Sequence, residues 1–132
     1  MKEKYLYFRT EATDANDDAS GDSACFPASS LMGMQPTSDT ALTLYFRSML
    51  RGSGQEGAAD NVANLDNNDS VILTISANTH ITAMKAITNA IHGDNFPAFL
   101  VIANDDSDGT EYLAGSGVTA CGTISVSAAY TN

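Results

Sequence analysis

The chain has 132 residues, 43% of them hydrophobic, and a formal net charge of −10 at pH 7. This length suits one domain, predicted to span residues 1–132, and the hydrophobic content is too high for a disordered chain. No run approaches the roughly 18 consecutive apolar residues of a membrane span. Sixteen acidic residues against six basic ones give a surface that repels nucleic acid. Proteins bind nucleic acid through Lys and Arg, which displace the counterions of the phosphates. The composition therefore predicts neither a membrane nor a nucleic-acid partner.

The segment 1–10 (MKEKYLYFRT) turns polar at once and lacks the apolar stretch of a signal peptide, so we expect no secretion by that route. The two cysteines, Cys25 and Cys121, form no CxxC pattern and lie among apolar or small residues, as buried thiols do. A disulfide between them would close a long loop, but without a signal peptide we expect a reducing compartment. Free, buried thiols are the favoured prediction, and a bridge is the alternative.

Residues 4–10 (KYLYFRT) have the aromatic content and the alternation of a β-strand. The alternation directs Leu6 and Phe8 toward the core and turns Tyr7 and Arg9 outward. A polar loop follows, and residues 23–29 predict a short strand at a sheet edge, because Pro27 cannot donate to a central ladder. We expect residues 31–39 (LMGMQPTSD) to form an ordered loop with its Leu and Met side chains under the sheet.

Residues 40–49 (TALTLYFRSM) predict the next strand and repeat the first one: LYFRT at 6–10 returns as LYFRS at 44–48. Both copies are expected to bury Leu and Phe and to expose Tyr and Arg. If the two strands lie near each other, the exposed side chains form a patch of the kind found at interface hot spots. The interface candidates are Tyr7, Arg9, Tyr45 and Arg47; ordinary solvated strand faces are the alternative.

Residues 51–70 are rich in Gly, Asn and Asp and predict a long loop that is mobile or ordered by a partner. Residues 71–77 predict a central strand, because both of its faces are apolar. Helical spacing of Ile and Met then predicts an amphipathic helix at about 79–92. Asn78 or Thr79 is expected to cap its start, and Gly93 is expected to end it in the left-handed conformation.

Residues 98–103 (AFLVIA) are apolar on both faces and predict another buried strand, followed by strands at 111–114 and 119–128. The order of strands, one helix and further strands predicts the α+β class, mainly β with one helix. We expect a small barrel or roll of about six or seven strands, because strands and helices do not alternate as in βαβ units.

The turn at 104–110 (NDDSDGT) begins like the calcium loop of an EF-hand, with candidate ligands Asn104, Asp106 and Asp108. The pattern then fails, since the twelfth position is Gly115 where the motif has Glu. An Asp-Gly hairpin turn explains the same residues without a metal. The hairpin is therefore the favoured interpretation, and no cofactor is predicted.

Two other acidic segments, 14–22 and 66–69, keep no ligand spacing and are expected to be solvated loops. His80 and His92 fall at opposite ends of the predicted helix, too far apart to share a metal ion. The many Ser and Asp residues come with no nucleophile elbow or oxyanion-loop signature. The sequence therefore predicts a protein that is not an enzyme.

The segments KYLYFRTEATDANDD (4–18), TALTLYFR (40–47), DSVILTIS (69–76) and AFLVIAND (98–105) resemble small virion structural proteins of marine T4-like tailed phages of cyanobacteria. Small β-rich proteins of that kind can resemble the Sm-like barrel, a bent sheet that forms rings by edge pairing. The resemblance implies a structural or assembly protein of the virion or host cytoplasm, forming a homo-oligomer and contacting other virion proteins. The residues leave one alternative open, a small binding module for Ca²⁺ or for a carbohydrate on exposed tyrosines.

Overall fold

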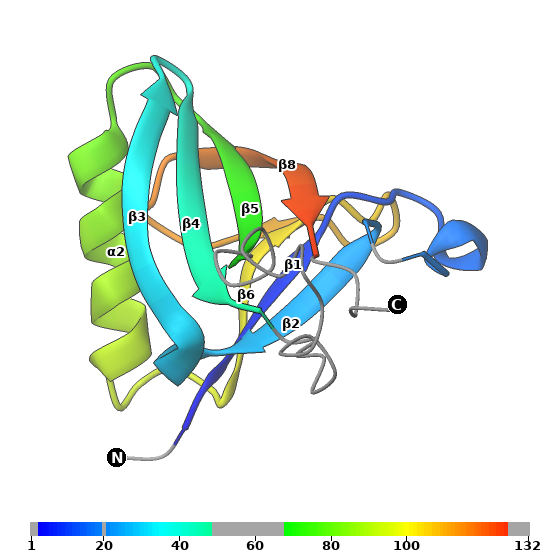
Figure 1. The fold of residues 1–132 in the computed structure, drawn as a ribbon, viewed down its shortest axis with the longest axis horizontal. Coiled ribbons are helices and arrows are strands. Elements are labelled where there is room, and N and C mark those ends of the chain that lie inside the picture. Colours follow the sequence, from blue (N-terminus) through cyan, green and yellow to red (C-terminus); the bar gives the residue numbers. More distant parts are fainter. Residues whose placement is uncertain (1–2, 20, 49–67, 127–132) are drawn as a thin grey trace, which may run out of the picture.

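The computed structural model describes residues 3–19, 21–48 and 68–126, and Figure 1 shows their arrangement. The strands are β1 (Tyr5–Arg9), β2 (Ser23–Pro27), β3 (Leu31–Ser38), β4 (Ala41–Arg47), β5 (Asn68–Ile75), β6 (Phe99–Asn104), β7 (Glu111–Tyr112) and β8 (Val118–Ser125). The helix α2 (His80–His92) follows β5, and two short 3-10 helices, η1 (Asp14–Asn16) and η2 (Ala28–Ser30), flank β2. Most of the expected loop 51–70, and the last residues of the expected strands 40–49 and 119–128, lie outside the described residues.

The strands form two four-stranded sheets. Sheet A has the order β2-β1-β6-β7, with β1 antiparallel to β2 and parallel to β6. Sheet B has the order β3-β4-β5-β8 and is antiparallel throughout. The expected class, mainly β with one helix, is confirmed, and β5 is a central strand as predicted. The described strands do not close into a barrel, because no hydrogen-bonded ladder joins the two sheets.

The two copies of the LYFR motif lie in different sheets, and their buried residues meet in the core. The rings of Phe8 in β1 and Phe46 in β4 pack edge to face, with their centroids 5.8 Å apart. Phe26 of β2 stacks on Phe46 at 4.1 Å, and all three side chains are fully buried. Burial alone stabilises each such side chain by about 1.5–3 kcal/mol. Each copy of the motif therefore supplies a buried Leu and Phe to one shared core.

The helix matches its predicted range within one residue, and it buries Ala83, Ile87 and Ala90 against the sheets. Thr79 is the N-cap residue, but its hydroxyl donates to the carbonyl of Ser76 at 2.7 Å and makes no capping bond to the helix. Among the described residues, no helix is long and apolar enough to cross a membrane.

The end of the helix differs from the prediction. Gly93 has φ −83° and ψ 135°, which is extended rather than left-handed backbone. The capping group comes from the other end of the chain: Nζ of Lys4 donates to the carbonyl of Ala90 at 2.7 Å and to that of Gly93. Lys4 is only 8% exposed. A cation at a helix C-terminus is stabilising, so the lysine does the work that a left-handed glycine does elsewhere.

The prediction of a loop at residues 31–39 is wrong, because this segment forms strand β3. The strand pairs with β4 with two register irregularities, one near Gly33 and one near Pro36, which break the period-two pattern that marks a strand. The structure also leaves Met32 exposed rather than under the sheet.

The helix contacts the edge of β3 at one end, and a pocket separates the two elements at the other end. Nε2 of His80, at the start of α2, lies 2.7 Å from the carbonyl oxygen of Ser38 at the end of β3. At the other end, Leu31 shares a pocket lining with Thr88 and Ile91 of the helix. Figure 1 shows α2 running along β3 at one side of the molecule. The two register irregularities of β3 and the helix contact at one end disfavour pairing of this edge with a further strand.

The edge of β8 faces sheet A instead of solvent. The hydroxyl of Thr10 donates to the carbonyl of Cys121 at 3.1 Å. The backbone N–H of Cys121 donates to Oδ2 of Asp105, also at 3.1 Å. These bonds satisfy backbone groups of β8 that would otherwise offer a pairing template.

Candidate interaction surface

The outer face of sheet A carries a group of apolar side chains brought together by strand register. Tyr7 lies opposite Cys25 of β2 and Val101 of β6, and Tyr5 lies opposite Pro27 and Phe99 in the same way. Partners in register share a face, and the inner face is defined by buried Leu6, Phe26 and Leu100. We call the opposite set the outer apolar face; it consists of Tyr5, Tyr7, Cys25, Pro27, Phe99 and Val101.

Two aromatic side chains of this face reach solvent to an unusual degree, whereas Tyr7, Pro27 and Val101 are half-buried. Phe99 is 53% exposed and Tyr5 is 45% exposed. The rings of Tyr7 and Phe99 lie 5.0 Å apart, so the face has a preformed aromatic pair at its centre. Residues 98–103 were expected to be buried on both faces, and the structure corrects this: Leu100 and Ile102 are buried, but Phe99 is not.

The outer face of sheet B is polar by comparison. It presents Thr43, Tyr45 and Arg47 of β4, the strand that pairs with both β3 and β5. The hydroxyl of Tyr45 donates to Oε1 of Gln35 at 3.1 Å, and Nη2 of Arg47 donates to the carbonyl of Ser29 at 2.7 Å. Because the inner faces of the two sheets pack together, Tyr7 and Tyr45 point to opposite sides of the molecule. The four candidate residues of the LYFR copies therefore do not form one patch.

Arg9 shares the outward orientation of Tyr7, but the expectation that it is exposed is wrong, since only 6% of it reaches solvent. Nε donates to the carbonyl of Glu11 at 2.6 Å. Nη2 lies 2.8 Å from Asp14 in an ion pair that lacks the alignment of a full hydrogen bond. Nη1 lies 3.8 Å from Asp17 and 3.6 Å from Asp106. The acidic segment 14–22, which was expected to be a solvated loop, and the turn at 104–110 thus converge on one guanidinium.

Contact with Asp14 and the charge of Asp106 raise the pKa of the guanidinium, against the opposing effect of burial. A loop and a turn form the cover over Arg9. The N–H and the hydroxyl of Ser107 both donate to the carbonyl of Ala12, at 3.0 and 2.9 Å. The acidic residues therefore close one end of the outer face of sheet A and leave its apolar end open.

The turn at 104–110 joins the antiparallel strands β6 and β7 in a hairpin, as predicted. It is not a two-residue Asp-Gly turn, because the last ladder pair is Asn104 and Glu111 and Gly109 is not among the residues with positive φ. Its candidate ligands are engaged with the turn itself. Oδ1 of Asn104 accepts the N–H of Asp106, and Oδ1 of Asp106 accepts the N–H of Asp108, both at 3.0 Å. The second carboxylate oxygen of Asp106 faces Arg9. Within the described ranges, no three His, Cys, Asp or Glu side chains are grouped to hold a metal ion.

The second acidic segment, 66–69, also departs from expectation where it is described. Asn68 and Asp69 belong to strand β5, and Asp69 is fully buried rather than solvated.

Asp105 lies between two groups whose ionisation it opposes. It accepts a hydrogen bond from the hydroxyl of Tyr112 and one from the N–H of Cys121. Burial, together with the charge of Asp105, raises the pKa of Tyr112 and that of Cys121 to about 12. Partial desolvation by its neighbours also raises the pKa of Cys25. Both thiols are free; Cys121 is buried as predicted, whereas Cys25 is exposed on the outer apolar face.

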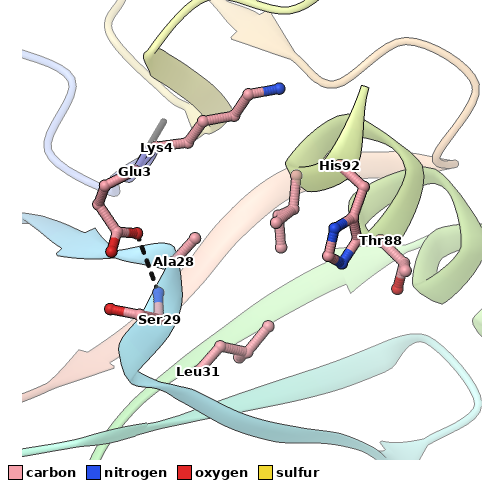
Figure 2. A pocket seen from close by; sticks show the side chains of 8 residues that line it. Glu3, Lys4, Ala28, Ser29, Leu31, Thr88 and His92 are labelled. Atoms are coloured by element: carbon pink, nitrogen blue, oxygen red, sulfur yellow. Dashed lines mark hydrogen bonds between the residues drawn. The ribbon is translucent and has the colours of Figure 1, made fainter. Parts of the chain in front are cut away.

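A pocket of about 460 Å³ lies between the end of α2 and the segment that joins the two sheets. Figure 2 shows Glu3 and Ser29 on one wall and Thr88 and His92 on the helix wall. The carboxylate of Glu3 accepts the backbone N–H of Ser29 at 3.1 Å, and the chain of Lys4 leads away to the helix terminus. The described hydrogen bonds do not connect His92 with a carboxylate or hydroxyl. A preorganised set of nucleophile and base is thus not observed here.

Comparison with known proteins gives no match to a family model, to a curated protein or to a solved structure.

Proposed function

We propose that this chain is a non-enzymatic structural protein that assembles with copies of itself, as a component of a tailed-phage virion. The observation that carries the assembly proposal is the outer apolar face. Monomeric proteins seldom expose large contiguous apolar patches, and such a patch marks a contact site. The virion setting, with the virion or host cytoplasm as location and other virion proteins as further partners, rests on the resemblance of the strand and helix segments to small virion proteins.

The mass in solution tests the assembly proposal. We expect static light scattering over a dilution series to give a mass that rises with protein concentration above that of one 13.8 kDa chain. A constant mass of one chain at the highest concentration would refute self-assembly. For the virion setting, capsid or tail genes beside the gene of this protein would support the proposal, and a metabolic operon would oppose it.

A carbohydrate-binding module is the second candidate, because Tyr5, Tyr7 and Phe99 together offer aromatic rings on which a sugar can stack. Sugar sites also need polar groups that orient the hydroxyls. The neighbours of these rings are Cys25, Pro27 and Val101, which supply little hydrogen bonding. The face therefore favours protein contact, and titration with a panel of oligosaccharides separates the two functions.

The calcium version of the binding module has less support, since the oxygens of Asn104 and Asp106 already accept hydrogen bonds in the turn. Calorimetric titration of Ca²⁺ into wild type and Asp106→Ala tests it. Heat that is present in wild type and absent in the variant would revive this function.

A further inference from the structure

We infer that the partner of the outer apolar face is the same face of a second copy, packed face to face about a two-fold axis. This inference rests on the proposed function and adds the surface, the partner and the symmetry. It differs from the edge pairing that the resemblance implies, and three features of the molecule support it.

The first feature is charge. Each copy carries −10, so two copies repel each other in most orientations. The six residues of the outer apolar face carry no charge, and the carboxylates around Arg9 lie at one end of this face rather than within it. A basic partner would gain nothing from contact with this uncharged face and would prefer the acidic loops. A second copy, in contrast, can approach closely only where charge is absent, and this face meets that condition.

The second feature is the state of the sheet edges. The edge of β3 has two register irregularities and contacts the start of α2 at Ser38, and the edge of β8 is bonded to sheet A. Of the remaining edges, β7 has only two residues, and β2 has five and ends in Pro27. Short strands, bulges and proline are the devices by which proteins prevent edge pairing. Pairing through a face is therefore favoured over growth through an edge.

The third feature is self-complementarity. A two-fold contact packs a patch against the same patch of the second copy, so the patch must be complementary to itself in shape and charge. Aromatic and aliphatic side chains such as Tyr5, Tyr7 and Phe99 do so, and their rings can stack across the interface. The apolar centre spans three neighbouring strands about 4.8 Å apart. It is small beside the roughly 800 Å² per partner of a stable interface, so we expect a weak dimer in the micromolar range or above.

Sedimentation velocity of three variants tests the inference. Phe99→Asp places a charge on the face, and Tyr5→Asp repeats the change at a second position in case the first impairs folding. Met32→Asp is the matched control: Met32 is 51% exposed against 53% for Phe99, but it lies on β3 of sheet B. All three variants have the same net charge, so a general effect of charge cancels in the comparison.

In a two-fold contact each substitution occurs twice. If each occurrence costs a factor of about ten, which is modest for an aromatic anchor, the dissociation constant rises about 100-fold in both face variants. Met32→Asp should dimerise as wild type does, and circular dichroism should show all variants folded. Wild type that stays monomeric at every concentration refutes the proposed function itself. Association of wild type that survives both face substitutions, or is lost equally in Met32→Asp, overturns the inference alone.

Discussion

Replacing Lys4 by methionine tests the unusual end of the helix. The change keeps most of the aliphatic stem and removes the ammonium that binds the carbonyls of Ala90 and Gly93. A hydrogen bond to a charged group contributes about 1.5–3 kcal/mol, and a cation at a partly buried helix C-terminus contributes up to about 2 kcal/mol. The two contributions overlap and cannot be added. Burying methionine also avoids the desolvation cost of burying an ammonium, which offsets part of the loss. We therefore expect Lys4→Met to lower the free energy of unfolding by about 2 kcal/mol.

Equilibrium unfolding in urea measures this loss, and for a chain of this length it corresponds to a fall in Tm of roughly 6–8 °C. The control is Lys85→Met, because Lys85 is exposed on the same helix and should change stability by less than about 0.5 kcal/mol. The slope of the unfolding free energy against urea should stay the same, since the folded surface is unchanged. Equal stabilities of the two variants would refute the capping role of Lys4.

Three further outcomes follow from the charges and contacts. Arg9→Met should lower the urea midpoint clearly while Arg47→Met barely changes it, although both arginines end an LYFR motif, because only Arg9 is buried among carboxylates; similar midpoints would contradict this. Tyr112 and Cys121 keep their protons more tightly when folded, with pKa values of about 12 against ordinary values of 10.0 and 9.0. Stability from these groups is therefore complete below pH 9 and lost as the pH rises toward 12, and Tyr112→Phe should make the loss above pH 10 shallower in urea unfolding series. Self-association should strengthen with added NaCl, since salt screens the repulsion between like-charged copies; sedimentation showing dissociation by salt would indicate an ionic interface instead.

The elements that could be predicted from the sequence are those set by local pattern. Strands β1 and β4 follow from alternating Leu and Phe, and α2 follows from the spacing of its Ile and Met residues. Strand β3 was missed, because Gly33, Pro36 and two register irregularities remove the alternation. The burial of Arg9 was missed for another reason. Arg9 is buried by a loop and a turn that lie almost a hundred positions apart in the sequence, and no local pattern indicates that they contact each other.

The outer apolar face also depends on pairing that local pattern does not give. It requires the parallel ladder between β1 and β6, which lie far apart in the sequence. A signal was nevertheless present: positions 5 and 7, 25 and 27, and 99 and 101 are apolar or aromatic on the side opposite the core residues. For residues 98–103 that two-sided pattern was interpreted as burial, whereas the described residues leave Phe99 uncovered. Two-sided apolar strands thus mark either a buried sheet or an interface.

The reactivity of Cys25 tests the central claim most directly. Its thiol lies on the outer apolar face. Cys121, the other cysteine of the chain, is buried and has a pKa of about 12, so it should not react with the reagent. We predict that the rate of labelling by a thiol reagent falls as protein concentration rises through the range of association. In Phe99→Asp the rate should stay fast throughout. A rate that is independent of concentration while the mass increases would place the contact elsewhere, and slow labelling even of the dilute monomer would mean that the chain itself covers the face.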